Sequence, residues 1–160
     1  KKALTAAVSK FHTAASILEY LRTNVIPPSL DLERQVNHDG TKLDLSPAVL
    51  SMCEYAMLAQ GQCCIYETAK LRPKPMHIML AKIAIGAAEL FDEALEKGGG
   101  KKEGVLINGT ADQQQNCKFN DSDSGSTYVG WIMHIQIMSL LYRARAEHHE
   151  VMAAKDKSSW

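Results

Sequence analysis

The stretch YAMLAQGQCCIYETA, residues 55–69, predicts a helix that is apolar almost all round. Two glutamines, Gln60 and Gln62, interrupt its central part. A helix without a broad polar face must be enclosed by other helices on several sides. The glutamines then need hydrogen-bond partners, because a buried amide without one costs about 1–3 kcal/mol. The stretch therefore predicts a helix that is surrounded by other helices.

Three further helical patterns flank this stretch, and no segment convincingly predicts a strand. Pro27-Pro28 ends the first pattern, because proline cannot continue the helical hydrogen-bond ladder. Ser46-Pro47 opens the second, since serine suits the helix cap and proline the first helical position. Gly98-Gly99-Gly100 closes the third. The four helices are predicted over residues 3–24, 46–71, 75–97 and 126–154.

The arrangement of these helices predicts an all-α fold in one domain of residues 1–160. Residues 98–127 are rich in glycine, serine and other polar residues, and this composition predicts a mobile insert. The other joins are short enough for an antiparallel helical bundle or a piece of a helical-repeat solenoid. Because the first residue is Lys1 rather than methionine, we expect the chain to be a piece of a longer protein.

The charge balance excludes a strong net attraction to nucleic acid or to an anionic bilayer. Eighteen basic residues face eighteen acidic ones, so the formal net charge is zero. No apolar run approaches the roughly 20 residues that a membrane span requires. The four cysteines show no Cys-x-x-Cys spacing and are expected to be reduced thiols, mostly buried as small apolar side chains. These observations favour a cytosolic chain with reduced thiols.

The last predicted helix has more apolar surface than one packing face requires. A helix that packs on one side of a bundle needs a single apolar stripe, yet this helix has two. One of the stripes must therefore meet the rest of the protein or a partner. The first consists of Tyr128, Trp131, Ile135, Met138, Tyr142 and Ala146, and the second of Met133, Ile137, Leu140, Leu141 and Ala144.

Two interpretations of Leu95, Trp131 and Ile135 remain open at this point. These residues either belong to the core, as apolar stripes at helical spacing usually do, or line a groove for an amphipathic partner helix. In such a groove each well-buried anchor would contribute about 1.5–3 kcal/mol.

No pattern of catalytic or metal-binding residues is found. The sequence contains no G-x-G-x-x-G and no G-x-x-x-x-G-K-[ST] motif. Glu147-His148-His149-Glu150 is the best metal-like cluster, but adjacent helical residues point about 100° apart and cannot converge on one ion. Paired Glu-x-x-His motifs for a di-iron bundle are also missing. We therefore predict no cofactor, no metal and no enzymatic activity.

Several stretches resemble the BRO domain family, the ALIX-like scaffolds of membrane remodelling, and they occur in the family's order. The family's signature helix is similar at Met57, Leu58, Ala59, Gln60 and Gln62, although Gly61 and Cys63 replace the usual alanine and glutamate. The other similar stretches are Tyr20-Leu21-Arg22, Pro28-Ser29-Leu30-Asp31-Leu32, Leu43-Asp44-Leu45-Ser46-Pro47, residues 80–95, and the pattern of Trp131, Tyr142, Ala144, Ala146 and His149.

The resemblance implies the central, tetratricopeptide-like helical part of a longer, banana-shaped BRO domain. Domains of this family bind the C-terminal amphipathic helix of an ESCRT-III subunit, of the charged multivesicular body protein class. The partner-binding residues that the resemblance implies are Leu95, Trp131 and Ile135, together with Met138, where the family often has lysine. Trp131→Asp and Ile135→Asp are expected to abolish peptide binding and to leave the melting temperature nearly intact.

The function that the resemblance implies is a non-catalytic scaffold for endosomal sorting, multivesicular body formation and membrane scission. Such a scaffold is cytoplasmic, is recruited to endosomes, and associates with membrane only indirectly or peripherally. The alternative function is a helical-repeat adaptor for a different peptide partner, such as an adaptor in PalA-type pH signalling.

Overall fold

The computed structural model describes residues 2–26, 47–74, 76–98 and 124–158, with side chains described in these ranges except at 124–129 and 157–158. Four long helices make up almost all of the described residues, and none of these residues lies in a strand. The helices are α1 (Lys2–Tyr20), α2 (Pro47–Lys70), α3 (His77–Lys97) and α4 (Ser124–Ser158), and a π-helical turn, η1 (Leu21–Val25), continues α1. The all-α prediction is therefore confirmed.

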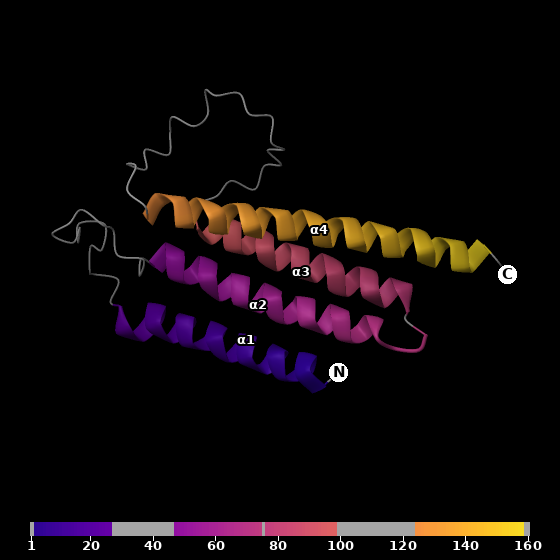
Figure 1. The fold of residues 1–160 in the computed structure, drawn as a ribbon, viewed down its shortest axis with the longest axis horizontal. Coiled ribbons are helices and arrows are strands. Elements are labelled where there is room, and N and C mark those ends of the chain that lie inside the picture. Colours follow the sequence, from indigo (N-terminus) through magenta and orange to yellow (C-terminus); the bar gives the residue numbers. More distant parts are fainter. Residues whose placement is uncertain (1, 27–46, 75, 99–123, 159–160) are drawn as a thin grey trace, which may run out of the picture.

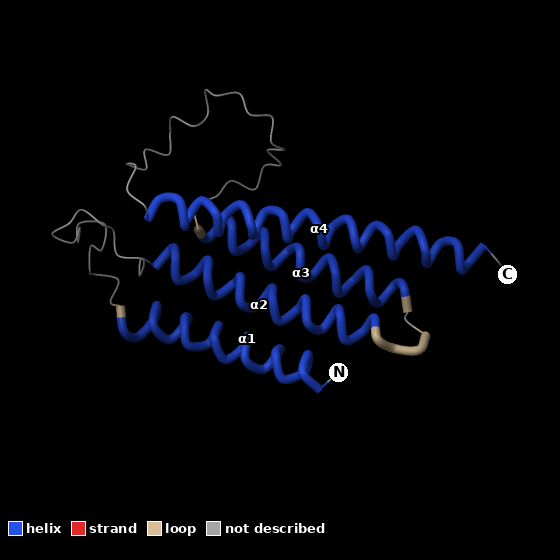
Figure 2. The backbone as a smooth tube through the Cα atoms, viewed as in Figure 1, coloured by secondary structure: helices blue, strands red, loops and turns tan. Residues whose placement is uncertain are grey.

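The helices lie side by side in chain order, and each runs antiparallel to the next (Figure 1). Extensive contacts join α1 to α2, α2 to α3, and α3 to α4, whereas the described parts of α1 and α4 share no comparable contact. α4 has 35 residues and is about 52 Å long, so it extends beyond the other helices at the C-terminal end (Figure 2). The fold is thus an open row of antiparallel helices.

α2 is enclosed as its sequence predicts, with α1 on one side and α3 on another. None of its residues from 49 to 69 is exposed, and the buried ones cover most of the helix circumference, which explains why its sequence has no broad polar face. Small residues let the neighbouring helices approach closely: a Cβ atom added at Gly61 would lie 3.2 Å from the His12 ring of α1. On the α3 side, the Gln62 amide donates to the Ile83 carbonyl at 3.5 Å, which gives this glutamine a partner.

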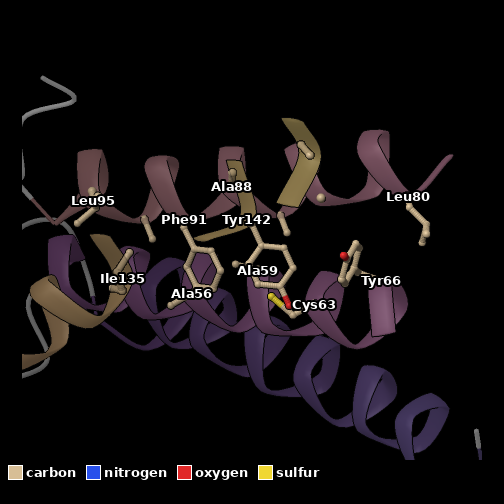
Figure 3. Packing of buried hydrophobic residues seen from close by; sticks show 14 of the residues in the cluster. Ala56, Ala59, Cys63, Tyr66, Leu80, Ala88, Phe91, Leu95, Ile135 and Tyr142 are labelled. Atoms are coloured by element: carbon tan, nitrogen blue, oxygen red, sulfur yellow. The ribbon is translucent and has the colours of Figure 1, made fainter. Parts of the chain in front are cut away.

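The hydrophobic core lies between α2, α3 and α4 (Figure 3). Its largest fully buried side chains are Phe91, Met52, Leu80 and Ile135. The rings of Tyr66 and Tyr142 meet edge to face, with centroids 5.5 Å apart. Each large buried side chain contributes about 1.5–3 kcal/mol to folding, so this core is what joins the three helices.

Polar contacts fix the register of neighbouring helices at the surface of this core. The Arg22 guanidinium lies 3.0 Å from the Glu54 carboxylate and joins η1 to α2. The Ser139 hydroxyl donates to the Asp92 carboxylate at 2.5 Å, and Arg143 pairs with the same carboxylate. These contacts join α3 to α4.

The ends of the helices agree with the sequence in part. α2 begins at Pro47, the predicted first helical position, and ends at Lys70, one residue before the predicted end, whereas α4 ends four residues later than predicted, at Ser158. Gly98 follows α3 with φ −76°, so it is not a left-handed cap. A Cβ atom there would lie 2.7 Å from the Met52 sulfur, which explains the glycine. The predictions for Pro27-Pro28, for Ser46 and for residues 99–123 of the insert lie outside the described residues.

Within the described ranges, no helix is long and apolar enough to cross a membrane.

Candidate functional site

The two apolar stripes of α4 have different environments. In the first stripe Ile135, Tyr142 and Ala146 are buried in the core. The second stripe faces outward: Ile137 is 57% exposed and Leu140 is 59% exposed, and Met133 and Leu141 are exposed as well. The described helices leave this face uncovered, so the prediction of surplus apolar surface on α4 is confirmed.

The structure does not gather the four predicted partner-binding residues on one open surface. Leu95 and Ile135 are core residues with 7% and 1% exposure, and Met138 packs partly buried against the core. Trp131 alone is exposed, at 47%. The expectation that Ile135→Asp leaves the stability intact is therefore wrong, because this substitution would bury a carboxylate without a partner. The role of the four residues in binding stays a prediction.

Trp131 and Ile135 line a groove of about 520 Å³ that lies between α1 and α4. We call it the α1/α4 groove. Since α1 and α4 both pack on the central helices and not extensively on each other, the space between them stays open. The buried side chains of Phe91 and Ile135 form its floor. Its complete lining is Phe11, Ala56, Met57, Gln60, Phe91, Gly130, Trp131, His134 and Ile135.

Helical register places these side chains together. Met57 and Gln60 are three residues apart on α2, and Trp131 and His134 are three residues apart on α4, so each pair shares one helix face. Gly130 has no side chain, and a Cβ atom there would meet nothing within 4 Å. The signature residues Met57 and Gln60 thus form one wall of the groove, and the predicted residue Trp131 forms the opposite wall.

The chemistry of the α1/α4 groove is apolar and uncharged. None of its lining residues is an Asp, Glu, Lys or Arg, and its polar side chains are Gln60 and His134. The His134 ring packs edge to face on the Trp131 ring, with centroids 6.4 Å apart and an interplanar angle of 84°. This contact helps to hold the indole in place. The groove suits an aliphatic or aromatic anchor, with a hydrogen bond available from the Gln60 amide.

Sequence reasoning missed Phe11 as a groove residue. Phe11 is a residue of α1, and it is only half-buried. Its position opposite Trp131 depends on the distance between α1 and α4, for which the sequence carries no signal.

A buried polar network joins α4 to α2 and α3 at the other end of the molecule. The Tyr66 hydroxyl lies 2.8 Å from His149 Nε2, and His77 Nδ1 lies 3.0 Å from His149 Nδ1. Burial lowers the pKa of His149, and His77, His148 and Lys70 lower it further. The sequence carries no signal for the contact between His77 and His149, because the two residues are 72 positions apart. Of the cluster at residues 147–150, only His149 is buried.

The buried thiol of Cys63 is not set up as a nucleophile. Burial raises the pKa of Cys63 to about 11, and burial also raises the pKa of Tyr142, whose hydroxyl lies next to the Cys63 sulfur (Figure 3). A neutral thiol reacts poorly, because the thiolate is the reactive form. Among the described side chains, no group of three or more His, Cys, Asp or Glu residues is placed to hold a metal ion.

The family model of the BRO1-like domain matches residues 1–160. The chain belongs to the BRO1-like domain family. The resemblance drawn from the signature helix is thereby confirmed over the whole chain. No curated protein and no solved structure matches it. Membership in the BRO1-like family supports a protein-binding scaffold in ESCRT-related sorting as the general class of function.

Proposed function

We propose that this BRO1-like domain is a non-catalytic scaffold that recruits an ESCRT-III subunit of the charged multivesicular body protein class. The observation that carries the proposal is the uncharged, apolar α1/α4 groove, which the signature residues Met57 and Gln60 line together with Trp131. The groove holds the C-terminal amphipathic helix of the subunit. The scaffold acts in the cytoplasm, is recruited to endosomes, and serves multivesicular body formation and membrane scission.

The energy of binding comes from apolar side chains that enter the α1/α4 groove. Trp131 leaves about half of its surface in solvent, and a partner helix would cover that surface together with Met57 and Phe11. Tryptophans buried in an interface are frequent hot spots, and their replacement by alanine weakens the binding free energy by about 2 kcal/mol or more. Ile135 contributes to the floor of the groove from within the core, whereas Leu95 is a core residue that does not line the groove.

The test is a titration of the domain with labelled C-terminal helix peptides of ESCRT-III subunits, followed by fluorescence anisotropy. Trp131→Ala is expected to weaken binding about thirtyfold, which corresponds to about 2 kcal/mol. Leu140→Ala is the matched control, because Leu140 is an exposed apolar residue on the outward face of the same helix. It is expected to change the Kd less than about twofold.

Melting temperatures of both variants are measured alongside, and both are expected to stay within about 2 °C of the parent domain, as surface substitutions usually do. Equal effects of Trp131→Ala and Leu140→Ala would place the binding site elsewhere. A specific interaction would have a Kd far below about 500 μM. If no ESCRT-III peptide binds at a peptide concentration of about 500 μM, the proposed partner class is wrong. Binding of a PalA-type partner peptide in place of these peptides would establish the alternative adaptor function.

A further inference from the structure

A second groove lies on another face of α1, between α1 and α3, with α2 beneath it. We call it the α1/α3 groove. Its volume is about 740 Å³, and none of its lining residues belongs to the α1/α4 groove. The lining consists of Thr5, Val8, Ser9, His12, Thr13 and Ser16 of α1, of Ile65, Thr68, Ala69 and Arg72 of α2 and the turn that follows it, and of Met79 and Ile83 of α3.

The shape of the α1/α3 groove follows from helical register. The lining residues of α1 recur at three- and four-residue steps from Thr5 to Ser16, so one face of the helix borders the groove. Three turns of helix span about 17 Å, which is long enough for three turns of a bound helix or a shorter extended peptide. Val8, Ile65, Met79 and Ile83 make the groove mostly apolar, and serine and threonine hydroxyls lie among them.

The charged residues around the α1/α3 groove are positive. No carboxylate lines it, whereas Arg72 does. Residues 1–18 contain three lysines and no acidic residue, and residues 68–88 contain no acidic residue either. Glu67, just before that second segment, already pairs with Lys70 and Arg145. Since the whole chain has a formal net charge of zero, this basic region is local.

The cations in this region are available to a ligand. Lys2 lies one helical turn before Thr5, on the face of α1 that borders the groove, and Lys82 lies three residues after the lining residue Met79 on α3. The ion pairs found in the described ranges do not involve Arg72, Lys2 or Lys82. Lys2 and Lys82 are exposed, and so is Arg72. An apolar groove with unpaired cations at its edge complements a segment that carries both apolar side chains and negative charges.

We propose that the α1/α3 groove binds an acidic amphipathic segment of a partner protein. Aliphatic side chains of the segment pack on Val8, Ile65 and Met79. Carboxylates that flank them pair with the Arg72 guanidinium and with Lys2 and Lys82 at the edges. This site is separate from the α1/α4 groove, so the domain would bind two segments at once, either of one partner or of two.

The test uses a defined probe, a helical peptide of about 14 residues with leucines at i, i+3, i+4 and i+7 and glutamates at the flanking positions. A second peptide has lysine in place of every glutamate. Titration of the isotope-labelled domain is followed by NMR, which reports both the Kd and the residues that the peptide contacts. The expected result is a Kd at least about tenfold lower for the glutamate peptide, with shifts confined to the lining of the α1/α3 groove.

Arg72→Glu is expected to weaken binding of the glutamate peptide about tenfold. The control is Lys97→Glu, which makes the same charge reversal at an exposed residue at the opposite end of α3. It is expected to change the Kd less than about twofold, since screening at ordinary salt limits a distant charge. Melting temperatures of both variants show that the domain remains folded.

Three results would overturn the proposal: equal Kd values for the two peptides, equal effects of the two variants, or no binding at about 500 μM peptide. Trp131→Ala is expected to leave the Kd of the glutamate peptide unchanged. A loss of binding in that variant would show that the peptide occupies the α1/α4 groove instead, and this too would contradict the proposal. The outcome is independent of whether ESCRT-III peptides bind at Trp131.

Discussion

Ile135 and Ile137 offer a comparison of buried and exposed apolar surface within one helix. They are the same residue type, two positions apart on α4, and their side chains are 1% and 57% exposed. Ile135 packs in the core with Leu95 and Phe91, whereas Ile137 lies on the outward face. We predict that Ile135→Ala destabilises the domain strongly and that Ile137→Ala does not.

The magnitudes follow from the burial. Replacing isoleucine by alanine removes three carbon groups, each contributing about 0.8 kcal/mol when fully buried. At Ile135 the cavity that remains adds to this loss, and the total is expected to be about 2–5 kcal/mol. At Ile137 less than half of the side chain is covered. The higher helix propensity of alanine offsets part of the smaller loss there, so the change is expected to stay within about 0.5 kcal/mol.

The measurement is urea unfolding followed by circular dichroism, with thermal unfolding alongside. A difference of 2–4 kcal/mol between the variants corresponds to roughly 5–15 °C in melting temperature for a domain of this size. Equal midpoints for the two variants would refute the assignment of the inner and outer faces of α4. A strong loss of stability at Ile137 alone would show that something in the chain covers the outward face.

Three further predictions concern the polar groups. Burial lowers the pKa of His149 below its ordinary 6.5, so below about pH 6.5 the folded domain binds fewer protons than the unfolded chain. The free energy of unfolding should therefore fall as the pH drops below about 6.5. His149→Gln should flatten this dependence as seen in melting curves from pH 5 to 8, whereas His134→Gln, at an exposed histidine of the same helix that is far from His149, should not. Parallel curves for both variants would contradict the prediction. Arg22→Leu should cost about 1–3 kcal/mol in urea unfolding by leaving the buried Glu54 carboxylate unpaired, and the double variant with Glu54→Leu should recover part of that loss. With a pKa of about 11, Cys63 is only about 0.1% thiolate at pH 8. Its alkylation by iodoacetamide, followed by mass spectrometry, should therefore be far slower in the folded domain than in urea. Comparable rates would show that the thiol is accessible and activated.

The helices and their faces were largely predictable from the sequence. The stretch at residues 55–69 lacks a polar face, and the structure encloses it between α1 and α3. The two stripes of α4 were visible as a surplus of apolar residues, and the outward face that this surplus implies is present. These features depend on periodicity along one helix, which neighbouring residues report directly.

The composition of the grooves was less predictable. Leu95, Trp131 and Ile135 share an apolar character, yet only Trp131 is exposed. Phe11 and Met57 lie in the same groove as Trp131 although they come from different helices. The basic edge of the α1/α3 groove was also hidden, because the total charge of the chain is zero. Which residues line a groove between helices is decided by how the helices pack against one another, and the sequence of a single helix does not report this.

The amino-acid sequence alone determined the all-α class, the order of the helices and the family, since these follow from local spacing and short motifs. The tertiary structure alone decided which apolar stripe of α4 is covered and which residues meet across the two grooves. It also paired His149 with His77 and Tyr66. The physical reason is that burial and proximity are set by the packing of helices far apart in the chain, and a side chain's chemistry does not state which neighbour it will meet.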